Sequence, residues 1–169
     1  MSTKIYNDLF AEFQKEGIVI REVSTDELKR HSSNSDSGFI NYECNGDVFN
    51  SAFILVDCSI SIELKINVLL HEFGHYLHYK KIGCDQAKQL QQNVDNWIIV
   101  DEFEAFKFQL IKVYTIAIDN DINILRNTML RLIDRFNNDS DLRYREALNR
   151  LFQDEIWQKA KKLTGLSLN

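Results

Sequence analysis

Hydrophobic positions along the chain follow two spacings, one typical of helices and one typical of strands. Apolar residues every three or four positions predict helices, and short runs rich in β-branched residues predict strands. Asn45-Gly46, between two predicted strands, is a strong hairpin signal because both residues tolerate positive φ. The predicted strands are residues 18–23, 39–44 and 48–56, and the predicted helices are residues 4–16, 24–30, 60–81, 85–96, 97–118, 122–136 and 141–163.

Several polar residues and glycines mark the ends of these elements. Gly17 and Gly83 stand where helix C-caps belong, and Ser24 with Glu27 has the spacing of a capping box. The elements predict an α+β fold, mostly helical, with a small mixed sheet of about three strands beside the helix over residues 60–81. The order of the strands does not follow from the sequence.

The all-helical character of the second half predicts the domain organisation. We assign residues 1–118 to an α+β domain and residues 119–169 to a helical C-terminal extension packed on it. A chain of 169 residues is long enough to bury a core of its own.

Charge and cysteine content narrow the partners and the compartment. The net charge of −5 argues against nucleic acid or an anionic membrane as a direct partner. The chain shows no secretory signal and no apolar run long enough to span a bilayer. Cys44, Cys58 and Cys84 are odd in number and form no Cys-x-x-Cys pair, which predicts free thiols and a cytoplasmic protein.

The segment His71-Glu72-Phe73-Gly74-His75 carries the most specific chemistry in the chain. Residues four apart lie on one face of a helix, so both imidazoles are able to bind one Zn²⁺ ion. Glu72 projects beside them and is placed to take a proton from a metal-bound water. This pattern predicts a zinc metalloprotease, with His71 and His75 as ligands and Glu72 as the catalytic base.

A catalytic zinc site needs a third protein ligand, and the candidates follow in Asp101-Glu102-Phe103-Glu104. Glu102 borders the apolar face of its predicted helix, close to Ile99 and Phe106, whereas Glu104 points away from that face. A glutamate at the edge of a core face is better placed to meet a neighbouring helix, so Glu102 is favoured over Glu104.

Taken together, the His-Glu-x-Gly-His segment and Glu102-Phe103-Glu104-Ala105 resemble the motifs of the ImmA/IrrE family of zinc metallopeptidases. The resemblance covers residues 50–111. It implies that His71, His75 and Glu102 hold the zinc and that Glu72 is the general base. It also implies a protein substrate such as a repressor, often with a DNA-binding regulator as partner.

The chain departs from the family pattern at Phe106, where the family often has Asn or Asp able to support a ligand histidine. His78 falls one residue early for a histidine that often follows the family's zinc helix. No helix-turn-helix motif is evident, so a DNA-binding partner would be a separate protein. The sequence also suggests that the strand over residues 48–56 pairs with an extended substrate. The candidate oxyanion stabilisers are Tyr42, Tyr76, Tyr79 and Tyr114.

Three functional classes remain open from the sequence. The first is an active zinc endopeptidase that cuts a specific regulatory protein. The second is a catalytically weak or inactive zinc-binding protein that acts through a helical interaction surface, and it would be indifferent to Glu72→Gln. The third is a structural or adaptor domain that binds no metal. The sequence does not identify the substrate, the cleavage site or the oligomeric state.

Overall fold

The structure, a computed structural model, describes residues 2–32, 37–45, 48–90 and 92–166. Its contacts divide the chain into two compact units, residues 1–89 and residues 90–169. Each unit is described by itself below. The domain boundary predicted after residue 118 stays a prediction, because compactness alone does not show which segments fold independently.

The first unit combines a three-stranded sheet with helices. Strand β3 lies at the centre, parallel to β1 on one side and antiparallel to β2 on the other, so the sheet is mixed. This confirms the predicted fold class. The elements are α1 (Ser2–Lys15), β1 (Ile18–Val23), α2 (Thr25–His31), β2 (Gly38–Asn45), β3 (Val48–Asp57), α3 (Ile62–Ile82) and α4 (Cys84–Leu90).

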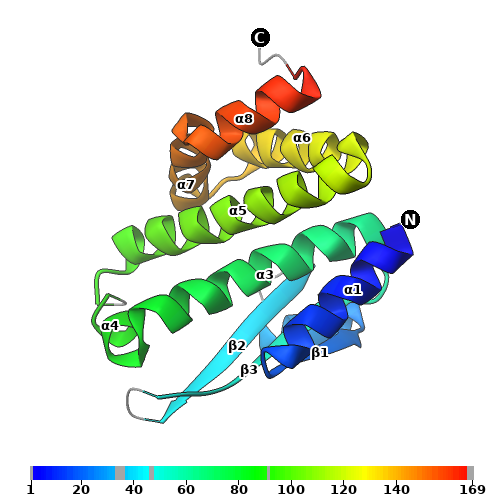
Figure 1. Cartoon of the computed structure of the whole chain (residues 1–169). Helices are drawn as coiled ribbons and strands as arrows, with labels where there is room; N and C mark the ends of the chain where they lie inside the picture. Colours follow the sequence, from blue (N-terminus) through cyan, green and yellow to red (C-terminus); the bar gives the residue numbers. More distant parts are fainter. Residues whose placement is uncertain (1, 33–36, 46–47, 91, 167–169) are drawn as a thin grey trace. The chain divides into compact units, whose positions relative to one another are not determined.

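Alternation along the strands separates the two faces of this sheet. Ile54 is fully buried on the face covered by α1 and α3 (Figure 1), whereas Leu55 points to the opposite face. There Leu55 forms a buried cluster with Val23 of β1 and Leu28 of α2. Helix α3 is therefore held against the sheet by an apolar layer, as its predicted position requires.

Local capping signals of the first unit are confirmed. The Ser24 side chain accepts a hydrogen bond from the Glu27 backbone N–H, and Gly17 adopts a φ of +83° after α1. Strands β2 and β3 pair as an antiparallel hairpin. Two residues of its predicted turn region, Gly46 and Asp47, lie outside the described residues.

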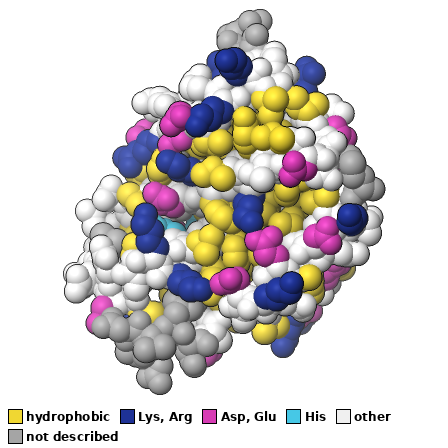
Figure 2. All heavy atoms as spheres, viewed as in Figure 1, with side chains coloured by type: hydrophobic (Ala, Val, Ile, Leu, Met, Phe, Trp, Pro, Cys, Tyr) yellow, Lys and Arg dark blue, Asp and Glu magenta, His cyan; other side chains and the backbone are white. Residues whose placement is uncertain are grey.

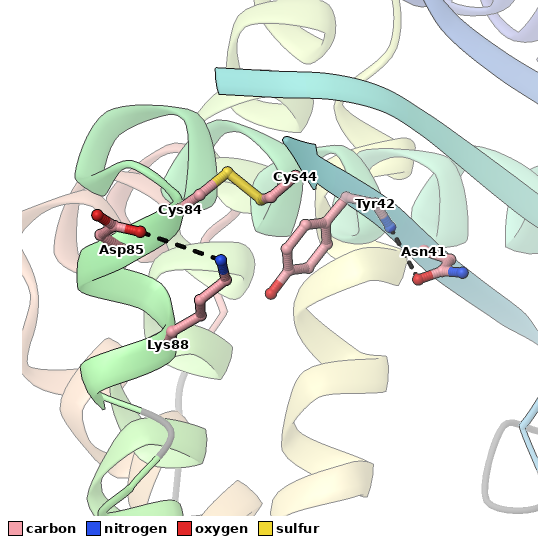
Figure 3. Close-up of a disulfide and its surroundings, with 6 residues drawn as sticks. All are labelled: Asn41, Tyr42, Cys44, Cys84, Asp85 and Lys88. Atoms are coloured by element: carbon pink, nitrogen blue, oxygen red, sulfur yellow. Dashed lines mark hydrogen bonds and ion pairs between the residues drawn. A yellow bond between two sulfur atoms is a disulfide. The ribbon is translucent and has the colours of Figure 1, made fainter. Parts of the chain in front are cut away.

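A disulfide joins Cys44 of β2 to Cys84, the first residue of α4 (Figure 3). The prediction of free thiols is therefore wrong for these two cysteines and holds for Cys58, which is exposed. The spacing of the two cysteines gave no sign of the bond, because the pairing depends on strand β2 reaching the end of helix α3.

The second unit consists of helices around one apolar core. They are α5 (Val94–Asp119), α6 (Ile122–Asn138), α7 (Leu142–Gln153) and α8 (Glu155–Thr164). Trp157, Leu148 and Leu125 are fully buried in it. None of the helices that the structure describes in either unit is both long enough and apolar enough to cross a membrane.

The last predicted helix, over residues 141–163, is wrong as a single element, because Asp154 divides it into α7 and α8. Asp154 has an extended backbone, and its side chain accepts a hydrogen bond from the Ile156 backbone N–H at 3.0 Å. The same carboxylate binds Lys107 Nζ of α5 at 2.7 Å. The amphipathic spacing continues through both helices and therefore conceals the break.

Candidate metal centre

Helix α3 carries the histidine pair, and contacts at both ends and along one side fix its position. Ser61 caps its N-terminus by accepting a hydrogen bond from the backbone N–H three residues later. Gly83 ends it with a φ of +79°, a conformation that strains other residues. The Phe73 ring stacks on Phe13 of α1, with centroids 3.8 Å apart and planes 7° apart. These contacts fix the rotation of α3 about its own axis and therefore which of its residues face away from α1.

His71 and His75 lie one helical turn apart and bring their imidazoles together. Their Nε2 atoms are 3.2 Å apart, and the two rings are almost perpendicular, at 86°. Two nitrogens bound at ~2.0–2.1 Å to one tetrahedral Zn²⁺ would be ~3.3 Å apart. The pair thus has the spacing that a shared ion needs, although the same distance also suits a hydrogen bond between one protonated and one unprotonated nitrogen.

Glu102 lies on α5 and is buried, with 7% of its surface exposed. Glu104, on the same helix, is only partly buried. Glu102 is thus the less exposed of the two glutamates, in the order that the helical spacing predicted. Asp101 is equally buried, at 7%, and was not singled out from the sequence.

One set of potential metal-ligating side chains stands out among the residues that the structure describes. His71 and His75 of α3 each offer one imidazole nitrogen, and Glu102 of α5 offers one carboxylate oxygen, as candidate ligands of one ion. Two imidazole nitrogens and one carboxylate oxygen are the donor set of a catalytic zinc site that keeps a fourth position open. Glu104 and His78 do not belong to this group.

Phe106, which departs from the family pattern, has a clear packing role. It is 1% exposed, and the Arg135 guanidinium lies 5.2 Å from the centre of its ring. The ring belongs to the core of the second unit, where an Asn or Asp would lose this packing. His78 is also buried, at 7%, and its ring stacks near that of Tyr79.

The candidate oxyanion tyrosines fall into different surroundings. The Tyr76 hydroxyl donates a hydrogen bond to the Glu16 carbonyl at 3.3 Å, which holds this side chain against the end of α1. Tyr42 of β2 and Tyr79 of α3 place their ring centroids 4.1 Å apart. Tyr114 lies on α5 and is partly buried. The role of each in catalysis stays a prediction.

The predicted pairing of residues 48–56 with an extended substrate is wrong for most of that strand. Strand β3, which includes residues 48–56, pairs with β1 on one side and with β2 on the other. Residues 52–56 of β3 are paired on both sides and therefore cannot add a substrate segment to the sheet. Residues 48–51 lie beside β2 alone, and for them the pairing with a substrate stays a prediction. The sequence predicts a strand before the helix that carries His71 and His75, but it does not predict the place of that strand in the sheet.

Two carboxylates of the first unit, the buried Asp57 and the more exposed Glu22, lie outside the candidate metal group and accept hydrogen bonds from other elements. Asp57 is 2% exposed and accepts hydrogen bonds from the Ser59 hydroxyl and backbone N–H and from the Thr25 hydroxyl, at 2.6–2.8 Å. The bonds from Ser59, followed by the one from Thr25, hold the pKa of Asp57 below its ordinary value. This carboxylate therefore fastens β3 to α2 in its charged form.

The second carboxylate, Glu22 of β1, binds Lys65 of α3 and Tyr6 of α1. Burial raises the pKa of Glu22, but the hydrogen bonds from Lys65 and Tyr6 outweigh burial and hold the pKa below its ordinary value. Burial, followed by the hydrogen bond to Glu22, raises the pKa of the Tyr6 hydroxyl. Both groups keep α1 and α3 attached to the sheet.

Comparisons with protein-family models, with curated proteins and with solved structures find no match for this chain. The resemblance to the ImmA/IrrE family therefore rests on the motif residues alone.

Proposed function

We propose that the chain is a zinc-dependent endopeptidase in which His71, His75 and Glu102 bind the metal and Glu72 is the general base. The observation that carries the proposal is the candidate group of two histidines and one buried glutamate. The 3.2 Å between the two Nε2 atoms supports a shared ion. Glu72 directly follows the first ligand, at the position where such sites carry their base.

The chemistry divides between the ion and the chain. A zinc ion held here would act as a Lewis acid on the scissile carbonyl and lower the pKa of a water toward ~7. Glu72 accepts the proton of that water and passes it to the leaving amine. His71 and His75 act as neutral ligands and keep their positions through α3. The substrate we propose is a regulatory protein, on the strength of the motif resemblance alone.

The compartment is a separate matter. The prediction of a cytoplasmic protein rested partly on free cysteines, and the Cys44–Cys84 bond removes that part of the reasoning.

Metal analysis of purified variants tests the ligand set. Wild type is expected to hold one equivalent of zinc after dialysis, and His71→Ala and Glu102→Ala are expected to lose it. Glu104→Ala is the matched control, since it removes a carboxylate two residues away on the same helix. Loss of zinc in Glu104→Ala together with retention in Glu102→Ala would reverse the assignment.

Cleavage of an unfolded protein such as reduced casein tests the catalytic role. Glu72→Gln keeps the shape of the side chain but cannot take a proton. It is expected to keep its zinc and to lose about 10²–10⁴-fold in rate, the usual contribution of a general base. A variant as active as wild type would show that Glu72 is not the base.

One observation favours the alternative of a zinc-binding protein that acts through a helical surface. Among the described residues, seven of the eight large hydrophobic side chains that are exposed belong to the second unit. Figure 2 shows hydrophobic side chains reaching the surface among charged ones. The seven are Val94, Ile111, Ile118, Ile122, Leu130, Leu142 and Leu163. Under this alternative, Glu72→Gln would leave the biological activity unchanged while His71→Ala abolished it.

A further inference from the structure

Gly38 begins strand β2 at a point where the strand passes unusually close to helix α3. A Cβ atom at this position would lie 2.1 Å from Val68 Cγ1 and 3.5 Å from Glu72 Oε1. The φ of Gly38 is not in the left-handed region, which holds Gly17, Gly83 and Gly165. Gly38 is therefore needed for space and not for backbone freedom.

Val68 and Glu72 are one helical turn apart and face Gly38 together. The separation of 2.1 Å is about 1.3 Å short of 3.4 Å, where ordinary contacts begin. Valine is stiff at χ1 in a helix, so Val68 cannot simply rotate away. A side chain at residue 38 must therefore push β2 and α3 apart or force Val68 out of its rotamer.

The other end of β2 cannot follow such a movement freely. Cys44, six residues further along the strand, is bonded to Cys84 just beyond the C-terminal cap of α3. A displacement caused at Gly38 is therefore concentrated at the Val68 and Glu72 end of the contact.

We propose that Gly38 is a positioning residue for Glu72. By lacking a side chain, it lets the backbone of β2 form the wall beside the Glu72 carboxylate and so limits where that carboxylate can lie. This inference rests on the proposed function, in which Glu72 is the general base. Gly38 itself contacts neither the metal nor the reacting atoms in this proposal.

The test compares Gly38→Ala, Val68→Ala and the double variant in the full chain. Gly38→Ala is expected to keep one equivalent of zinc and to lose about 100-fold in kcat on casein, as a displacement of about 1 Å at a catalytic group can cost. In the double variant the clashing methyl is gone, and the remaining neighbours of the new Cβ stand at 3.4 and 3.5 Å. Its kcat is expected to return to that of Val68→Ala.

A second readout does not require turnover. Zinc has no visible spectrum, but Co²⁺ in the same site has absorption bands that respond to changes around the ion. Gly38→Ala is expected to shift these bands in the direction in which Glu72→Gln shifts them, and the double variant is expected to match Val68→Ala.

Three results would overturn the proposal: Gly38→Ala behaves as wild type in both readouts, the double variant stays as impaired as Gly38→Ala, or Gly38→Ala loses the metal. Wild type that binds Co²⁺ but cleaves nothing would refute the proposed function, and the spectra alone would then decide the role of Gly38. Wild type that binds no Co²⁺ would overturn both proposals.

Discussion

Removal of the disulfide between Cys44 and Cys84 should lower the free energy of unfolding by an amount that follows from the length of the loop that the bond closes. The bond closes a loop of 40 residues in the unfolded chain. In the chain-entropy description, a loop of this length lowers the entropy of the unfolded state by about 13 cal/mol/K, or about 4 kcal/mol at 25 °C. We expect Cys44→Ala with Cys84→Ala to lower the free energy of unfolding by about this amount. Alanine is preferred to serine because Cys84 is 2% exposed.

Urea unfolding without reductant, followed by far-UV circular dichroism, measures the loss. Both tryptophans, Trp97 and Trp157, lie in the second unit, so their fluorescence is less suited to following the unit that holds the bond. With a slope near 2 kcal/mol/M, the midpoint of unfolding should fall by about 2 M urea. Reduction of wild type should give the same fall.

Cys58→Ala is the matched control, because Cys58 is exposed and unbonded. It should leave the midpoint unchanged with and without reductant. Thiol titration of unfolded, unreduced wild type should find one reactive thiol of the three cysteines. Three reactive thiols would show that the bond does not form, and one thiol with an unchanged midpoint would refute the loop-entropy reasoning.

Two further predictions concern hydrogen-bonded carboxylates. Asp57→Asn should be less stable than wild type at pH 7. The pKa of Asp57 is lowered on folding, so its contribution to the free energy of unfolding is present above the unfolded-state pKa of ~4 and is lost as pH falls through the folded-state pKa. The difference in stability between wild type and Asp57→Asn, measured by urea titration, should therefore narrow below about pH 4. Asp154→Ala should lower the free energy of unfolding by about 1–2 kcal/mol, since it removes the α8 cap and the partner of Lys107. Asp154→Asn, which keeps a capping oxygen, should lose less, and equal losses would mean that the cap contributes little.

Elements that depend on a few neighbouring residues were predictable from the sequence. The Ser24 cap and the glycines after α1 and α3 act within one helical turn, so their spacing in the sequence carries the information. The histidine pair belongs to the same class, because a helix fixes the relation of positions four apart. Its prediction required only that α3 be a helix.

Features that depend on distant residues were missed. Whether Cys44 meets Cys84 depends on the direction and length of β2 along α3. The central position of β3 depends on its pairing with β1, which is distant in the sequence. Gly38 gave no signal, since the reason for its small size lies 30 residues away at Val68. Asp154 was missed because a single capping residue does not interrupt the hydrophobic spacing of the helices on either side.

The contacts between β2 and α3 occur in the same order along both elements. Gly38 meets Val68, Tyr42 meets Tyr79, and Cys44 is bonded just beyond the end of the helix. From residue 38 to 42 a strand advances about 13 Å, and from residue 68 to 79 a helix advances about 17 Å, a difference that two tyrosine side chains can span. Strand and helix therefore run in the same direction, in contact on both sides of the turn that carries the histidines. Contacts within residues 2–89 thus fix the turn of α3 that carries His71, Glu72 and His75. The third proposed ligand, Glu102, belongs to the second unit.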